Sequence, residues 1–210
     1  MERFNVEATL DAPGGSPEGL AWDGEHLWVS DSAENRVYKL DIESGDSLVT
    51  IPFNGKVAGC AWDGSHLWQV DNNTNTVSQI DPESGEIKVA LACDPGAGKL
   101  GGLCFDGEDL WLAVTGIGQL RRIRVKDGAI VKIHAVQDNV LGVGYDGRRL
   151  WFTEEGSDRI RLLDPPTGTE IMSYQLEGQP SGVAFVGPRE FWFAERNEKK
   201  LERVRLTRRK

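Results

Sequence analysis

The chain contains little of what several protein classes require. Cysteine occurs only three times, at Cys60, Cys93 and Cys104, and never at the close spacing of a zinc or redox motif. Three cysteines are few, and an odd number cannot all pair, which argues against a disulfide framework. They fit small core residues in a reducing compartment. No apolar run approaches the ~20 residues of a membrane-spanning helix. Residues 1–13 lack the apolar core of a signal peptide, so we expect a cytoplasmic protein.

Basic residues are also in deficit. Lysine and arginine number 24 against 33 aspartates and glutamates, which gives a formal net charge of −9. This balance discourages binding to nucleic acid or to an anionic membrane. Arginines and lysines do cluster at residues 121–126 and 203–210. We expect those clusters on solvent faces of outer strands, where charge protects sheet edges, with a nucleic-acid patch as the alternative.

The chain does contain one motif five times. The copies GLAWDGEHLW, GCAWDGSHLW, GLCFDGEDLW, GVGYDGRRLW and GVAFVGPREFW begin at Gly19, Gly59, Gly102, Gly142 and Gly182. Their intervals of 40, 43, 40 and 40 residues are typical of a stack of identical supersecondary units. No segment shows a helical period of apolar residues.

Each copy predicts four short strands separated by turn residues. In the first copy these strands are expected at residues 19–22, 26–30, 36–41 and 47–52, with Asp-Gly as the first hairpin turn. Four-stranded antiparallel meanders repeated in a ring form a β-propeller. The sequence therefore predicts one all-β propeller domain over residues 1–210, with repeats starting near 17, 57, 100, 140 and 180.

The two ends of the chain predict how the ring closes. The fifth copy stops after its third strand, expected at residues 200–206, while residues 3–11 precede the first copy as an extra strand. A ring with an open sheet edge would be prone to aggregation. We therefore expect the N-terminal strand to complete the last blade, giving a five-bladed propeller.

Positions that differ between the copies are candidates for function, because residues present in every copy serve the fold. The residue before each repeat glycine is charged only at Glu18. A lone carboxylate at the channel mouth could bind a cation or an amine, or act as a general base. The alternative is a solvated loop acid held by backbone N–H groups.

A second group of candidates opens the loop between the second and third strands. This position holds a carboxylate in four copies, Asp31, Asp71, Glu154 and Glu195, and Thr115 in the other. Four carboxylates around one rim could attract cationic ligands or hold Ca²⁺. An acid here could equally accept hydrogen bonds from its own turn, and recurrence favours that structural role.

Two further irregularities lie at the same predicted mouth. The long interval places its three extra residues in Cys93–Gly102, the segment expected to lead into the third blade. Its GAGK does not meet the spacing of a nucleotide-binding loop. Lys56 and Lys99 lead into adjacent blades at comparable points and could bind an anion, although pairing with the rim acids is the favoured interpretation.

Several motifs are similar to those of known propellers. PEGLAWDGEHLWVSD (residues 17–31) resembles the first blade of the regucalcin and gluconolactonase family, in which a glutamate at this position binds a divalent metal. The resemblance implies Glu18 as a ligand of Ca²⁺ or Mg²⁺, while that family's other ligands fall at Leu141 and Ser181 here. LWFTEEGSDRIRLLDPPTG (residues 150–168) resembles repeats of the streptogramin lyases.

The blade number is similar to that of the five-bladed glutamine cyclotransferases, which cyclise N-terminal glutamine. Their FTQGL and GEGL motifs align with SPEGL (residues 16–20) and VAGC (residues 57–60), which places Ala58 at the position of the catalytic glutamate.

The leading functional hypothesis is binding of a small molecule or peptide at an acidic mouth. The predicted binding residues are Glu18, Asp31, Asp71, Glu154, Glu195, Lys56 and Lys99. The first alternative is a lyase, hydrolase or cyclotransferase in which Glu18 is the catalytic base or a metal ligand. The second is a protein-interaction scaffold. The sequence leaves the oligomeric state open.

Overall fold

The structure is a computed structural model that describes residues 2–176 and 178–208. Within these ranges the chain forms twenty strands in five antiparallel sheets of four, and no helix. None of the described residues belongs to a helix of the length and apolarity needed to cross a membrane.

Each sheet is one blade, numbered here from the first repeat. Blade 1 contains β2 (Pro17–Trp22), β3 (Leu27–Asp31), β4 (Arg36–Leu40) and β5 (Ser47–Pro52). Blade 2 contains β6 (Val57–Trp62), β7 (Leu67–Asp71), β8 (Thr76–Ile80) and β9 (Ile87–Ala92). Blade 3 contains β10 (Lys99–Phe105), β11 (Leu110–Thr115), β12 (Gln119–Ile123) and β13 (Ile130–Ala135). Blade 4 contains β14 (Val140–Tyr145), β15 (Leu150–Glu154), β16 (Arg159–Leu163) and β17 (Glu170–Gln175). Blade 5 contains β18 (Pro180–Gly187), β19 (Glu190–Glu195), β20 (Lys200–Arg208) and β1 (Glu2–Asp11).

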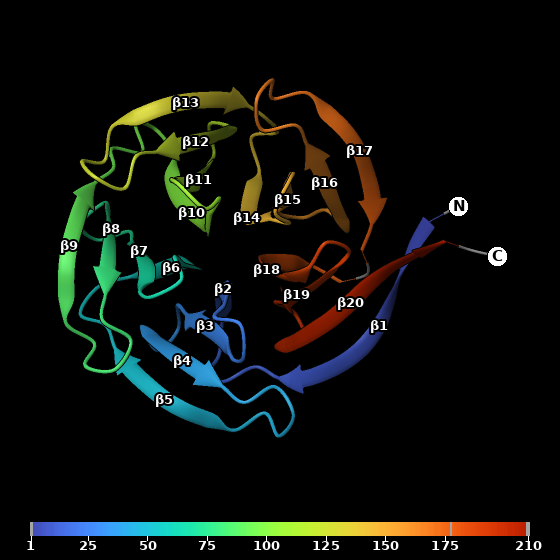
Figure 1. Ribbon diagram of the computed structural model, residues 1–210, viewed down its shortest axis with the longest axis horizontal. Helices are drawn as coiled ribbons and strands as arrows, with labels where there is room; N and C mark the ends of the chain where they lie inside the picture. Colours follow the sequence, from blue (N-terminus) through green and yellow to red (C-terminus); the bar gives the residue numbers. More distant parts are fainter. Residues whose placement is uncertain (1, 177, 209–210) are drawn as a thin grey trace.

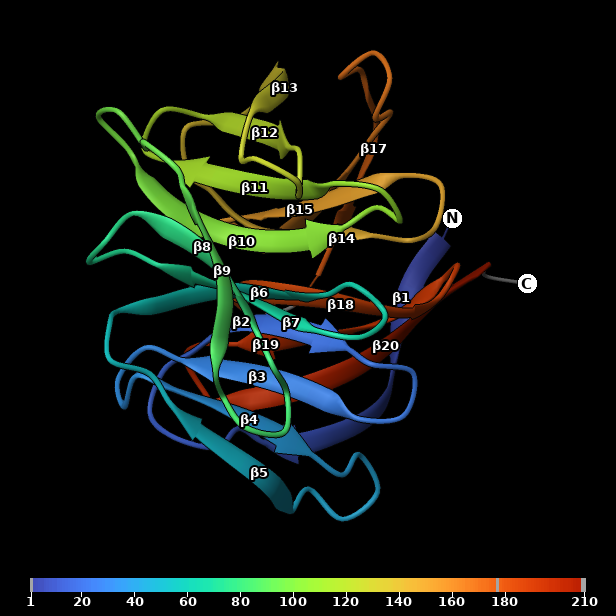
Figure 2. The same cartoon turned by 60° about the vertical axis from the view of Figure 1, so that its left-hand side comes forward.

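The blades are arranged around a central axis, as predicted. Figure 1 shows the first strands of the blades nearest the centre and the fourth strands at the circumference. Figure 2 shows the blades from the side, where the strands of blade 3 lie next to those of blade 2 and blade 1 follows. The five-bladed propeller expected from the repeats is confirmed.

The repeated glycines allow the inner strands to approach each other closely. A Cβ atom added to Gly142 would lie 1.9 Å from the carbonyl oxygen of Ser181 on the next blade. One added to Gly19 would lie 2.5 Å from the backbone nitrogen of Cys60. Because no side chain fits at such distances, only glycine permits this backbone contact around the axis. The first residue of the repeat motif is therefore required by the narrow ring.

Polar side chains link every pair of neighbouring blades. Thr153 Oγ1 of blade 4 donates to the carbonyl of Ser181 at 2.8 Å, and Ser181 Oγ of blade 5 donates to the carbonyl of Pro17 at 3.0 Å. The other three junctions are joined by Ser30–Gln69, Asn72–Leu100 and Thr115–Val140. Buried polar groups need partners, and here those partners belong to the adjacent blade.

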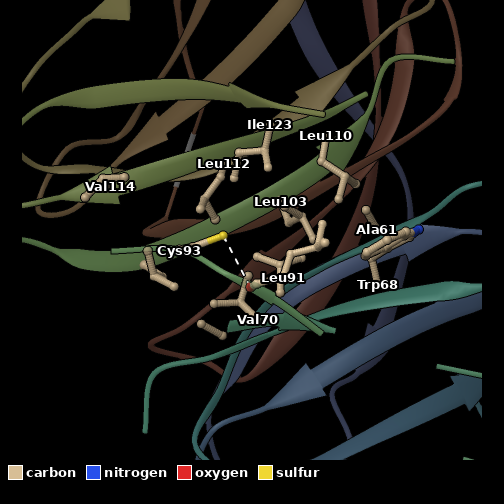
Figure 3. Close-up of a cluster of buried hydrophobic side chains, with 13 residues drawn as sticks. Ala61, Trp68, Val70, Leu91, Cys93, Leu103, Leu110, Leu112, Val114 and Ile123 are labelled. Carbon is tan, nitrogen blue, oxygen red and sulfur yellow. Dashed lines mark hydrogen bonds between the residues drawn. The ribbon is translucent and has the colours of Figure 1, made fainter. Parts of the chain in front are cut away.

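The remaining repeat residues form the core between blades. Figure 3 shows one such cluster, in which Trp68 and Val70 of blade 2 pack near Leu103 and Leu112 of blade 3. Cys93 lies in the same cluster, and all three cysteines are free and buried. Burial raises the pKa of Cys93 to about 11, so its thiol is protonated at neutral pH. The cysteines are core residues, as the sequence indicated.

The closing strand behaves as predicted. Strand β1 pairs antiparallel with β20 along its whole length, interrupted by one irregularity between Val6 and Ala8. Its apolar side chains pack on both neighbours of blade 5. Phe4 contacts Tyr174 of blade 4 edge-on at 5.6 Å between ring centroids, and Leu10 packs against the cluster shared with blade 1. The N-terminal strand therefore joins blade 5 to both adjacent blades.

Candidate functional site

A cavity of about 600 Å³ lies at the end of the ring where the inner strands begin. All five blades contribute to its lining, through the starts of inner strands and through the ends of second strands and the loops that follow them. Its size is within the range of sites for small ligands. Its charged lining residues are Glu18, Lys56, Lys99, Glu155 and Arg196.

Glu18 is held at one side of this cavity by three donors. Its Oε1 accepts hydrogen bonds from Ser32 Oγ at 3.0 Å, from Ser16 Oγ at 3.3 Å and from Arg196 Nη2 at 2.5 Å. Arg196 also reaches Glu155 Oε1 with its Nη1 at 3.4 Å. The result is a carboxylate–guanidinium–carboxylate bridge that connects blades 1, 5 and 4 across the mouth.

The sequence interpretation missed Arg196 and Glu155. Each directly follows a rim acid, Glu195 or Glu154, and in blades 1 and 2 the corresponding cavity residues are Ser32 and Asn72. The rim acids end their strands with side chains turned into the protein, so the next residue reaches the mouth. Comparing the five copies one position later would have revealed these residues.

The four rim acids themselves are buried, with exposed fractions between 0% and 5%. None is among the residues that line the cavity. Asp31 accepts the backbone N–H groups of Ala33 and Glu34 within its own turn, and that of Ser16 at 2.6 Å. This carboxylate therefore holds the turn after β3 against the segment that leads into β2.

The same arrangement recurs at two other rim acids. Asp71 accepts the N–H of Asn73 at 2.8 Å and that of Lys56 at 2.9 Å. Glu195 accepts the N–H of Glu198 and, at 2.9 Å, that of Gln179.

Glu154 differs, because its Oε2 lies 3.0 Å from Arg161 Nε. Asp31, Asp71 and Glu195 thus have the structural role in their turns that recurrence favoured, whereas Glu154 pairs with an arginine. Direct ligand binding by the four acids stays a prediction. With these acids buried, the mouth presents two carboxylates and three cations rather than an acidic surface.

Lys56 and Lys99 do line the cavity, and both are exposed. The interpretation that they pair with rim acids is wrong for this structure. In the described part of the chain, neither ammonium group forms an ion pair or a hydrogen bond. Asp71 accepts a hydrogen bond from the backbone N–H of Lys56 and does not pair with its side chain.

The inserted segment lies where the sequence placed it. It forms the loop between β9 and β10 together with the start of β10, and Pro95, Gly96 and Gly98 of the loop line the cavity. Arg121 Nη1 donates to the carbonyl of Asp94 and so fixes the loop to blade 3. The insertion therefore shapes one wall of the cavity.

The arrangement offers little to a metal ion. Among the described residues, no three His, Cys, Asp or Glu side chains gather as a metal site requires. Glu18 Oε1 already binds Arg196, Leu141 has no donor atom, and Ser181 Oγ is buried and donates to Pro17. These residues do not fit the three-ligand site implied by the regucalcin and gluconolactonase resemblance.

Comparison with known proteins identifies similar folds. No family model and no curated protein matches the chain. Among solved structures, the glutaminyl cyclase of Myxococcus xanthus is similar with a TM-score of 0.84 at 17% identity, covering 98% of this chain and 97% of that one. The virginiamycin B lyase of Staphylococcus aureus is similar with a TM-score of 0.59 at 21% identity, covering 94% of this chain and 69% of the lyase.

A streptogramin B lyase structure is similar over 97% of this chain and 98% of that one, with a TM-score of 0.59 at 15% identity. The structural neighbours are thus enzymes with the propeller fold, and at these identities the likeness shows the fold alone. It confirms the resemblance to streptogramin lyases and glutaminyl cyclases as a resemblance of architecture.

Proposed function

We propose that this protein binds a small polar molecule or the end of a peptide in the mouth cavity. The observation that supports this most is the Glu18–Arg196–Glu155 bridge, which is built from side chains found in single blades and lines a cavity of about 600 Å³. Residues needed only for the fold recur in the repeats, whereas these do not. A charged bridge at a cavity wall offers oriented hydrogen-bond partners to a polar ligand.

The proposed setting is the cytoplasm, supported by three free and buried cysteines. The net charge of −9 supports a ligand other than nucleic acid.

The test is a ligand-observed NMR screen of amino acids, dipeptides and small organic acids and amines. Molecules that bind the wild type should bind Glu18→Gln and Arg196→Gln at least about tenfold more weakly, because each change removes one charge of the bridge. The matched controls Glu43→Gln and Arg148→Gln change exposed residues outside the cavity lining and should bind normally. Equal binding by all four variants would contradict the proposal.

A second candidate is a cyclotransferase that acts on N-terminal glutamine. It is favoured by the near-complete mutual coverage and TM-score of 0.84 with the Myxococcus xanthus glutaminyl cyclase. Glu18 would be the general base, since Ala58 lines the same cavity and has no acid to offer. In this role Glu18 Oε2 is the available oxygen, because Oε1 accepts all three hydrogen bonds of this carboxylate in the described structure.

The cyclotransferase is tested by incubating a peptide with N-terminal glutamine and measuring ammonia loss by mass spectrometry. Turnover by the wild type that disappears in Glu18→Gln and persists in Glu43→Gln would support the enzyme. A rate equal to that of the peptide alone would exclude it. A lyase with a histidine at the cavity is not favoured, because no cavity-lining residue of the described chain is a histidine.

A further inference from the structure

The two sides of the mouth differ in how their charges are balanced. On the side of blades 4, 5 and 1, Arg196 lies between Glu155 and Glu18, so the cation has anionic partners. On the side of blades 2 and 3, Lys56 and Lys99 line the same cavity and, in residues 2–176 and 178–208, have no anionic partner. Positive charge is therefore left uncompensated on one wall of the cavity.

The backbone beneath both lysines is held in place. Lys56 donates its N–H to Asp71 and accepts the N–H of Asn72 at 2.8 Å on its carbonyl. The Asn72 side chain then bonds both the carbonyl and the N–H of Leu100, next to Lys99, at 2.8 and 3.1 Å. One short network thus places the starts of β6 and β10 side by side. The backbone that carries the two lysine side chains is therefore already ordered before a ligand binds, which lowers the free-energy cost of binding a ligand between the two blades.

The pair is specific to these two blades. The residue three positions before the repeat glycine is lysine in blades 2 and 3, and Ser16, Asn139 and Gln179 in the others. Lysine is a flexible point charge that binds carboxylate and phosphate oxygens without a fixed planar geometry. Two such charges facing one cavity repel each other until an anion binds.

We propose that Lys56 and Lys99 form an anion subsite, so that the ligand of this cavity carries a carboxylate or phosphate group bound at blades 2 and 3. The inference rests on the proposed binding function and narrows its ligand to small organic anions and zwitterions. A positively charged part of a zwitterion would face Glu18 on the adjoining blade 1, because Glu18 keeps Oε2 without a donor in the described structure. A bound zwitterion would therefore have one orientation, with its anionic group at blades 2 and 3 and its cationic group at blade 1.

The experiment titrates ¹⁵N-labelled protein with inorganic phosphate and with succinate at constant ionic strength. The amide signals of Lys56, Val57 and Lys99 report on the subsite. Saturable shifts are expected in the wild type, with affinity about tenfold lower in Lys56→Gln and in Lys99→Gln and lost in the Lys56→Glu, Lys99→Glu double variant. Both lysines are exposed, so these variants should keep the wild-type melting temperature.

The matched control is Lys126→Gln, which removes the same charge from an exposed turn outside the cavity lining. Normal affinity in this control supports the subsite. An equal loss in the control would overturn it, because general screening would then explain the shifts, and so would the absence of saturable shifts in the wild type. If amines or neutral amides bind with dependence on Glu18 while neither anion binds, the anion subsite fails and the proposed binding function stands.

Discussion

In blades 1 to 4 the tryptophan of the second strand donates its indole N–H to the aspartate of the preceding hairpin, whereas blade 5 has Val186 at that position. The four bonds, from Trp28, Trp68, Trp111 and Trp151, are 2.7 to 3.0 Å long. In the fifth blade Trp192 Nε1 is buried and has no hydrogen-bond partner in the described structure. Burying an unpaired donor costs free energy, so blade 5 forgoes a stabilising bond that the other blades share.

The reason lies in the hairpin of blade 5. The register of β18 against β19 shifts between Phe185 and Gly187, which marks an irregularity absent from the other first hairpins at this point. Blade 5 is also the blade assembled from both ends of the chain. The aspartate–tryptophan bond therefore stabilises individual hairpins but is not required for a blade to form, since blade 5 has four paired strands without it.

The largest expected effect follows from removing the closing strand. Deleting residues 1–11 would leave β20 with a free edge and remove Phe4 and Leu10 from the clusters on both sides of blade 5. We expect loss of cooperative unfolding in thermal denaturation followed by circular dichroism.

The control for the deletion keeps every strand and moves the chain ends. A circular permutant opened in the β8–β9 turn, with residues 2 and 208 joined by a short linker, is feasible because Glu2 pairs with Arg208. It should unfold cooperatively. If the deletion variant did so as well, with an unchanged melting temperature, the closing strand would not be needed.

The next effect concerns the tryptophans. Trp68→Phe should lower the free energy of unfolding by about 2 kcal/mol more than Trp192→Phe does, because only Trp68 gives up a bond to a carboxylate. Both changes remove similar volume from buried positions, so the difference isolates the indole N–H. Urea denaturation measures the difference. If both variants lost the same free energy of unfolding, the indole N–H of Trp192 would have a hydrogen-bond partner in solution.

A smaller effect distinguishes the hairpin glycines. Gly64 has a φ of +102°, which residues other than glycine rarely adopt, whereas the φ of Gly187 lies outside this positive range. A Cβ atom added at either position would meet no other atom within 4 Å. Gly64→Ala should cost about 1 kcal/mol through backbone strain alone, and Gly187→Ala should be neutral within about 0.5 kcal/mol. Chemical denaturation of both variants tests this. A cost at Gly187 similar to that at Gly64 would contradict the difference between the hairpins.

The smallest effect is a dependence on pH. Burial tends to raise the pKa of Asp63, but the backbone N–H groups of His66 and Ser65 and the indole of Trp68 bind the carboxylate, and the pKa is lowered. Because the pKa of Asp63 is lower in the folded state than in the unfolded state, its ionisation stabilises the fold at pH values above the unfolded-state pKa. This stabilisation is lost as the pH falls through the folded-state pKa. The difference between the losses of unfolding free energy in Trp68→Phe and Trp192→Phe should therefore become smaller toward pH 3, by less than about 1 kcal/mol. If this difference in unfolding free energy increased in acid, the stabilisation could not come from the bond between Trp68 and ionised Asp63.

Much of the architecture was readable from the sequence because it rests on local and repeated signals. Asp-Gly turns, alternating strands and a 40-residue interval predicted strand bounds within two residues of those found, and the bounds predicted for β5, 47–52, are the observed ones. The missing fourth strand of the last repeat predicted the pairing of β1 with β20. Glu18, Lys56 and Lys99 also line the cavity at the mouth, as their positions shortly before the repeat glycines predicted.

The partners of those residues were decided only by the tertiary structure. Arg196 and Glu18 are far apart in the chain, and they meet because closing the ring brings blade 5 against blade 1. The four rim acids are buried, three of them accept backbone N–H groups and the fourth, Glu154, pairs with an arginine, so Lys56 and Lys99 lack the partners expected for them. A repeated sequence determines each blade through local turns and strand pairing, whereas the charge balance of the mouth depends on which blades the closed ring places next to each other.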